Sequence, residues 1–187
     1  MAYAGGCPVG DEPPSDNIVQ YAEPFFHHGS YLEMQAFVAG NGGNCPVSTA
    51  TANIVPEIIS VTADQAIPPG TPFVLTAAAT DGNSDPLAYS WEQFDSGVAR
   101  PLSGEGAEDN GEGALFRVFP PVATGARTFP RMEDVLSGVP TPGERLPTVT
   151  DVTRRFRAMV RDNFAGAGGV AVSPFVEIHI APGTTPF

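Results

Sequence analysis

The segment Thr71–Phe94 restricts the fold of this chain more than any other, because it contains two strand-like runs separated by a turn. Apolar residues recur at every second position in both runs: Phe73, Leu75, Ala77 and Ala79 in the first, and Leu87, Tyr89 and Trp91 in the second. A period of two is that of a β-strand with one buried face. Residues 81–86, between the runs, are nearly all turn formers. We therefore predict a pair of β-strands here.

Trp91 is the only tryptophan of the chain and lies in the middle of the second run. Burying an indole ring removes a large apolar surface from water. We therefore predict that Trp91 lies at the centre of a β-sandwich core, together with Tyr89, Phe73 and Leu75. Glu92 should point to the opposite face of the same strand, and if it is exposed there, its replacement by alanine should change stability by no more than about 0.5 kcal/mol.

The most regular alternating segment is Arg154–Asp162. Its period of two adds Phe156 and Val160 to the predicted core. The opposite face carries three arginines, Arg155, Arg157 and Arg161. These arginines form either a cationic stripe that pairs with acidic residues of the sheet or of the long loop 95–113, or an ordinary solvated strand face.

Length and composition favour a mainly β protein. The chain has 187 residues and 42% hydrophobic residues, enough for one ordinary domain with a core. Its 20 prolines and 21 glycines divide it into short segments, as in folds with many turns. We predict an immunoglobulin-like or cadherin-like β-sandwich over residues 57–183, preceded by a small loop-and-helix part (1–46) and a linker (47–56). Residues 184–187 then begin another linker.

The charge balance excludes some classes of partner. The formal net charge is −12, and every positive residue is an arginine. Nucleic acids and anionic membranes need clustered cations, so we expect neither as a partner. No run of 18 apolar residues is present, so we expect no membrane span. An acidic chain of this kind suits an extracellular or periplasmic protein, or one that binds divalent cations. The N-terminal residues lack the features of a signal peptide, so we expect any signal peptide to lie upstream of residue 1.

Residues 1–46 contain a predicted helix. Ser30 and Glu33 have the spacing of a capping box, and apolar residues follow them. We predict a helix over residues 31–39 that ends at Gly40 in the left-handed conformation. The two cysteines, Cys7 and Cys45, flank this part. They either form a bridge, worth about 3–4 kcal/mol in the chain-entropy model, or are two free buried thiols.

A candidate calcium site follows the first strand. Asp81, Asn83 and Asp85 have the alternate spacing of calcium-binding loops, and Asp162 could add a ligand if both turns lie at one end of the fold. The alternative is ordinary turn chemistry, which needs no ion. Glu92 has the spacing of the last ligand of such a loop, but it lies in a predicted strand and we regard this as coincidence. His27 and His28 are either metal ligands or ordinary hydrogen-bonding residues.

Several segments resemble one protein family. The sequence MAYAGGC at residues 1–7, the sequence EPFFH at 23–27 and Ser30 are similar to the end of the catalytic domain in bacterial secreted, reprolysin-like zinc metallopeptidases of the metzincin group. Further segments resemble the domain that follows the peptidase in these proteins; they are WEQFD (91–95), DNGEGALFR (109–117), RTFPR (127–131), GERLPT (143–148) and RDN (161–163).

The resemblance implies that Met1 is the Met-turn methionine, which lies beneath the zinc in this family. The zinc-binding motif HExxHxxGxxH is absent, since the chain has only His27, His28 and His179. That motif lies before the Met-turn in the family, so we expect it upstream of residue 1, and we expect the chain to be a truncated or mis-started product. We therefore expect no cofactor, no zinc and no peptidase activity in this chain.

Three functions follow as expectations. The first is a non-catalytic C-terminal part of a secreted zinc metallopeptidase, whose sandwich acts as a spacer, a docking module or an adhesion module. Its partners would be the upstream catalytic domain of the same polypeptide and an extracellular protein or polymer. The second is a part of an active zinc-dependent endopeptidase whose zinc-binding half lies upstream. The third is a calcium-stabilised extracellular adhesion module.

Overall fold

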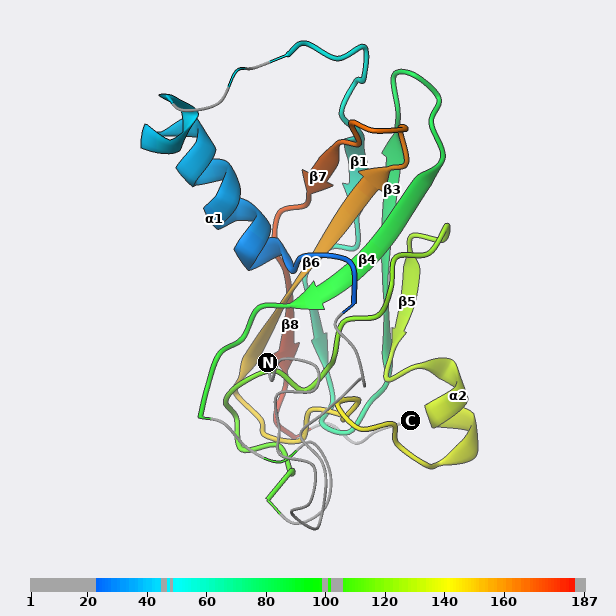
Figure 1. Ribbon diagram of the computed structural model, residues 1–187. Helices are drawn as coiled ribbons and strands as arrows, with labels where there is room; N and C mark the ends of the chain where they lie inside the picture. The colour runs from blue at the N-terminus through cyan, green and yellow to red at the C-terminus, as the bar shows by residue number, and fades with distance from the viewer. Residues whose placement is uncertain (1–22, 45–46, 48, 99–100, 102–105, 184–187) are drawn as a thin grey trace, which may run out of the picture.

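The computed structural model describes residues 23–44, 47, 49–98, 101 and 106–183 of the chain (Figure 1). The helices in this part are α1 (His28–Ala39), the 3-10 helix η1 (Asn41–Asn44) and α2 (Met132–Ser137). The strands are β1 (Glu57–Val61), β2 (Gln65–Ile67), β3 (Phe73–Thr80), β4 (Leu87–Gln93), β5 (Ala126–Phe129), β6 (Thr153–Asp162), β7 (Val170–Val172) and β8 (Val176–Ile180). The described part of the chain is therefore mainly β.

The strands form two sheets. The smaller sheet has the order β1-β3-β5, and both of its pairs are antiparallel. The larger sheet has the order β2-β8-β6-β4, and β7 also pairs with β6. Its pairs are antiparallel except for β2 and β8, which run parallel. The two runs of the segment Thr71–Phe94 are thus β3 and β4, which belong to different sheets.

The core lies between the two sheets and is built around four phenylalanines. The Phe73 and Phe129 rings stack with their centroids 5.1 Å apart, and Phe116 and Phe156 meet them at steep angles. Trp91 joins this cluster from β4 and is only 2% exposed. The other residues that the sequence assigned to the core are also buried; they are Tyr89, Leu75 and Val160. Two sheets that share one core are compatible with a β-sandwich.

Gly125, just before β5, connects the two sheets. Its carbonyl oxygen accepts the indole N–H of Trp91 at 2.8 Å and the backbone N–H of Ala77 in β3 at 3.0 Å. A Cβ atom at this position would lie 1.9 Å from the carbonyl oxygen of Ala77. Such a distance is impossible without backbone movement, so only glycine allows this close approach.

Helix α1 differs from the sequence-based prediction at both ends. It begins at His28, and the ring of His27 caps it by accepting the backbone N–H of Gly29. The predicted capping box of Ser30 was therefore wrong, because the helix and its N-cap begin three residues earlier. Gly40 ends the helix with φ −96° and not in the left-handed conformation. Its backbone N–H instead bonds the carbonyl oxygens of Ala36 and Phe37.

Only the first turn of α1 approaches the larger sheet. His28 is fully buried there, and the hydroxyl group of Tyr31 donates to the carbonyl oxygen of Val170 in β7 at 3.2 Å. All residues from Leu32 to Ala39 are exposed, and the far end of the helix points away from both sheets (Figure 1). In the described ranges, no helix combines the length and the apolar character needed to cross a membrane.

Candidate functional site

The Glu92 carboxylate is the centre of a buried polar cluster between β4 and α1. Its Oε2 atom accepts the backbone N–H of His28 at 2.6 Å and lies 2.9 Å from Nδ1 of the His28 ring. Nε2 of His27 lies 3.4 Å from the same oxygen. Glu92 and His28 are both 0% exposed. One carboxylate oxygen thus faces three nitrogen atoms from the start of the helix.

The local sequence explains this arrangement. Because Trp91 faces the core, Glu92 must face outward, and the first turn of α1 covers that side of β4. The first amides of a helix have no partner within the helix, and the positive end of its dipole favours a carboxylate there. Glu92 points away from the core as predicted, but it is buried, so the small effect expected for an exposed Glu92 does not apply. The alternation predicted that the Glu92 side chain points away from the core. It could not show that a helix far away in the sequence covers this face of β4.

The cluster has the donor types of a zinc site, but its hydrogen bonds do not fit one. The ligand atoms of His27, His28 and Glu92 all lie within 4.8 Å of one another, and this is the one such group in the described residues. However, Gly29 donates its backbone N–H to Nδ1 of His27 at 3.3 Å. The proton of the neutral His27 ring is then on Nε2, the atom that faces Glu92. A metal ion would need a lone pair on that atom.

The charge state of His27 agrees with a hydrogen-bonded cluster. Burial lowers the pKa of His27 below its usual 6.5, and the nearby Glu92 carboxylate opposes this shift only in part. His27 is therefore a neutral N–H donor at neutral pH. For His27, these contacts favour hydrogen bonding over metal binding, whereas Nε2 of the buried His28 ring has no hydrogen-bond partner among the described residues.

The cluster is connected to a neighbouring arginine. The hydroxyl group of Ser90 donates to Oε1 of Glu92 at 3.4 Å and accepts from a terminal nitrogen of Arg161 at 2.9 Å. The other terminal nitrogen of Arg161 donates to the carbonyl oxygen of Phe26 at 3.1 Å. Arg161 therefore fixes the segment before α1 from one side, and Glu92 fixes the helix start from the other.

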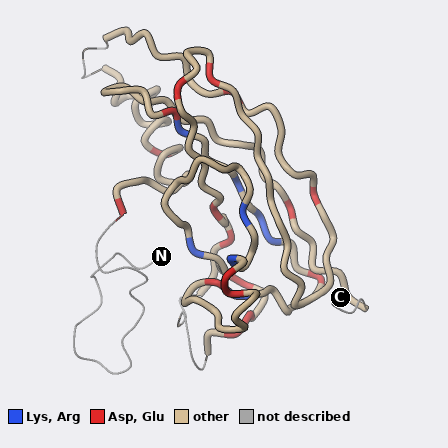
Figure 2. Tube along the Cα trace, turned by 90° about the vertical axis from the view of Figure 1, so that its right-hand side faces the viewer, with Lys and Arg blue, Asp and Glu red and all other residues tan. Residues whose placement is uncertain are grey.

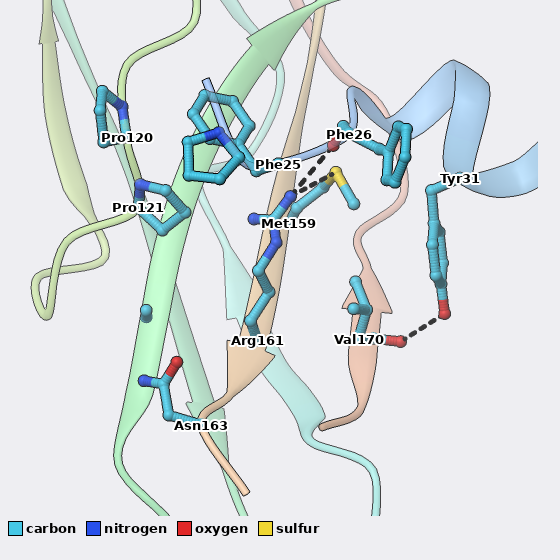
Figure 3. A pocket seen from close by; sticks show the side chains of 11 residues that line it. Phe25, Phe26, Tyr31, Pro120, Pro121, Met159, Arg161, Asn163 and Val170 are labelled. Atoms are coloured by element: carbon cyan, nitrogen blue, oxygen red, sulfur yellow. Dashed lines mark hydrogen bonds between the residues drawn. The ribbon is translucent and has the colours of Figure 1, made fainter. Parts of the chain in front are cut away.

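A pocket of about 500 Å³ lies beside this network on the outer face of the larger sheet (Figure 3). Pro120 and Pro121 lie on one side of it in this view, and Phe26 lies on the other, with Arg161 between them. Met159 from β6 is also part of its wall. The pocket is thus mainly apolar, with one charged group inside.

The three outward arginines of β6 have different partners. Arg155 lies 3.8 Å from a carboxylate oxygen of Asp95, and Arg157 lies 3.7 Å from the centre of the Phe175 ring. In Figure 2, the arginine positions (blue) lie among acidic positions (red) along the trace. These arginines are therefore not a plain solvated face, since each contacts a neighbouring side chain or backbone atom.

The sequence analysis missed a fourth arginine. Arg154 is 1% exposed and forms an ion pair with Asp109 of the loop that follows β4. Asp109 also accepts three backbone N–H groups, from Gly111, Thr148 and Val149. The period of two already places Arg154 on the same face as Phe156, so the pattern contained the signal. A buried charge needs a partner, which only the fold reveals.

The candidate calcium residues lie at one end of the fold, because Asp162 pairs with Leu87, two residues after Asp85, but Asp81, Asp85 and Asp162 do not form a close group of ligand atoms among the described residues. Asp81 Oδ1 accepts the backbone N–H groups of Asn83 at 2.8 Å and Asp85 at 3.0 Å, which is ordinary turn chemistry. Asp162 accepts N–H groups from Gly169 and Asn53. The Oδ2 atoms of Asp81 and Asp85 are buried without a hydrogen-bond partner among the described residues.

Burial raises the pKa of Asp85, and the neighbouring carboxylates of Asp81 and Asp162 raise it further. The three acids therefore repel one another at this end.

Met1, Cys7 and Cys45 lie outside the described residues, so the Met-turn and bridge predictions stay predictions. Comparison with known proteins finds no family model that matches this chain and no curated protein that is similar to it.

Proposed function

We propose that this chain is a non-catalytic accessory part of a secreted, reprolysin-like zinc metallopeptidase, with an immunoglobulin-like or cadherin-like β-sandwich that acts as a spacer or docking module. The sequence segments MAYAGGC and EPFFH resemble the end of the catalytic domain in that family. In this proposal, residues 1–46 belong to the catalytic domain, and α1 is its last helix. The second alternative, an active zinc-dependent endopeptidase, shares this origin and differs in needing the zinc-binding half on the same polypeptide.

The exposed apolar residues of α1 are the observation that carries the proposal. Phe37 is 69% exposed, and Leu32, Met34 and Val38 are exposed as well. Monomeric proteins seldom expose large apolar side chains together without a partner. A catalytic domain that packs on these residues would remove them from water, while the Glu92 cluster would hold the helix start on the sandwich. The sandwich and the peptidase would then be joined through one shared helix.

Two measurements test this proposal. The purified chain should contain less than stoichiometric zinc after dialysis and should not cleave casein. One bound zinc per chain together with chelator-sensitive cleavage would overturn the non-catalytic assignment. The DNA upstream of the Met1 codon should encode HExxHxxGxxH in the same reading frame. An upstream region without this motif would overturn the metallopeptidase origin and would leave the alternative of an independent module.

That alternative is a calcium-stabilised extracellular adhesion module, and the unpartnered oxygens of Asp81 and Asp85 favour it. Calcium takes carboxylate and carbonyl oxygens as ligands and would offset the burial and, to a lesser degree, the carboxylate repulsion that raise the pKa of Asp85. Adding calcium should then raise the melting temperature, and magnesium should raise it less. Asp85→Asn should abolish the calcium effect, whereas Glu57→Gln on the exposed part of β1 should preserve it. An unchanged melting temperature in millimolar calcium would exclude this module.

A further inference from the structure

The pocket beside Arg161 has the properties of a ligand site. Its volume of about 500 Å³ lies within the usual range for small-ligand pockets. Prolines and aromatic rings dominate its walls, and Arg161 is its only charged side chain. Proline rings and aromatic rings are rigid, so little side-chain entropy is lost when a ligand packs on them.

Arg161 is a cation without a carboxylate partner in the described part of the chain. Its terminal nitrogens bond the Ser90 hydroxyl group and the Phe26 carbonyl oxygen, and one of them also lies 3.5 Å from the Met159 sulfur. Burial lowers the pKa of Arg161, although Glu92 and Tyr31 oppose this. An arginine has five N–H groups and stays charged at neutral pH. A partly buried cation of this kind is stabilised by an anion that enters the pocket.

We propose that this pocket binds the C-terminal carboxylate of a peptide whose last side chain is apolar. A carboxylate can accept a charge-assisted hydrogen bond from the N–H groups of Arg161 that Ser90, Phe26 and Met159 do not use. The Phe25 ring lies 5.8 Å from the centre of that guanidinium group. In a C-terminal residue, the carboxylate and the side chain branch from one Cα atom, so the two groups can reach Arg161 and Phe25 together.

An acidic side chain within a peptide fits this site less well. Its carboxylate is carried on a short methylene stem and has no apolar group beside it to fill the space between Phe25 and the prolines. A free inorganic anion would satisfy only Arg161 and would leave the apolar walls in contact with water. Part of the wall, Phe25, Phe26 and Tyr31, lies in residues 1–46, which the proposed function assigns to the catalytic domain, but binding of a peptide end needs no zinc.

Calorimetric titration with three short peptides tests the proposal. The first is acetyl-Ala-Ala-Phe with a free carboxylate, the second is the same peptide as its C-terminal amide, and the third is acetyl-Ala-Glu-Ala amide. The free acid should bind with a dissociation constant at least about tenfold below those of the other two. Equal binding of acid and amide, or no binding of the acid at millimolar concentration, would overturn the proposal. Equal binding of the glutamate peptide would overturn the assignment to a chain terminus.

Variants locate the binding. Arg161→Gln should weaken binding of the free acid at least about tenfold, because it removes the cation. Arg157→Gln is the matched control, since Arg157 lies on the same strand and face but outside the pocket. It should leave the dissociation constant within about twofold.

Arg161 also holds Phe26 and Ser90, so Arg161→Gln could unfold the chain. Ala88→Leu provides a second variant, because Ala88 lines the pocket and the larger side chain would fill it without removing those hydrogen bonds. Thermal melting identifies which variants are folded. A folded Ala88→Leu variant that binds the free acid as tightly as the original chain would show that the ligand lies elsewhere, and would reject the pocket.

Discussion

The Oε2 atom of Glu92 lies 2.6 Å from the backbone nitrogen of His28, although 64 residues separate them in the sequence. This contact joins the first turn of α1 to the middle of β4, and both residues are completely buried. A single carboxylate therefore accepts one helix amide and contacts an imidazole ring where the buried residue of α1 meets β4. The attachment of the helix depends on this side chain together with the hydrogen bonds of Tyr31 to Val170 and of Arg161 to Phe26.

Glu92→Gln should destabilise the protein by about 1.5–3 kcal/mol, the usual range for a hydrogen bond to a charged group. The neutral amide accepts the His28 N–H more weakly and places N–H donors against other donors. Urea denaturation followed by circular dichroism measures the change. Glu177→Gln on β8 is the control, because Glu177 is exposed, and it should change stability by less than about 0.5 kcal/mol. Equal, small effects would mean that the cluster contributes nothing to stability.

His27 should make the protein less stable in mild acid. Burial lowers its folded-state pKa below 6.5, so the unfolded chain binds the proton more readily. Its contribution to stability is therefore complete above the unfolded-state pKa and is lost as the pH falls through 6.5 towards the folded-state pKa. Between about pH 7.5 and about pH 5.5, the original chain should lose more stability than His27→Gln. Parallel pH profiles for the two proteins would contradict this prediction.

Trp91→Ala should cost about 3–5 kcal/mol, because it leaves a cavity in the shared core. Trp91→Phe should cost less, about 1 kcal/mol beyond the change in packing, because it removes the hydrogen bond to Gly125. As the only tryptophan, Trp91 also reports its own environment: its emission should be blue-shifted in the folded protein and move to the red on unfolding. Phe37→Ala, at an exposed position, is the control. Similar losses for Trp91→Ala and Phe37→Ala would contradict the burial of Trp91.

Gly125→Ala should be strongly destabilising, since the new methyl group would lie 1.9 Å from the Ala77 carbonyl oxygen. We expect a loss of at least about 2 kcal/mol, the scale of overpacking with backbone displacement. Gly29→Ala is the matched control, because its methyl group would meet only an ordinary contact, 3.6 Å from the His27 ring. In the helix it should be neutral or stabilising by up to about 1 kcal/mol. Thermal melting compares the two, and the opposite order would show that the sheets do not approach at Gly125.

The sequence predicted the direction in which strand side chains point better than it predicted which residues surround them. The period of two assigned Trp91 and Phe156 to one face, because alternation is a local property of a strand. The same pattern oriented Glu92 but could not predict its burial, since the residues that cover it come from a helix far away in the sequence. The capping box failed for a related reason, because His27 caps the helix within a cluster that exists only in the folded chain.

The pocket could not be predicted from the sequence at all. Its walls come from the segment before α1, from β4, from β6 and from the loop at Pro120 and Pro121. No spacing rule connects these segments. The burial of Arg154, in contrast, could be predicted, because the alternation places it on the same face as Phe156. Its partner Asp109 could be identified only from the folded structure.

The exposed length of α1 has a mechanical consequence. A helix of 12 residues is about 18 Å long and is held to the sheet only near its first turn. A tilt of about 10° at Glu92 would move the Ala39 end by about 3 Å, from this length and simple geometry. A small tilt of α1, caused by protonation or substitution near Glu92, would therefore move the Ala39 end much farther than the first turn. A domain packed on Phe37 would be displaced with that end.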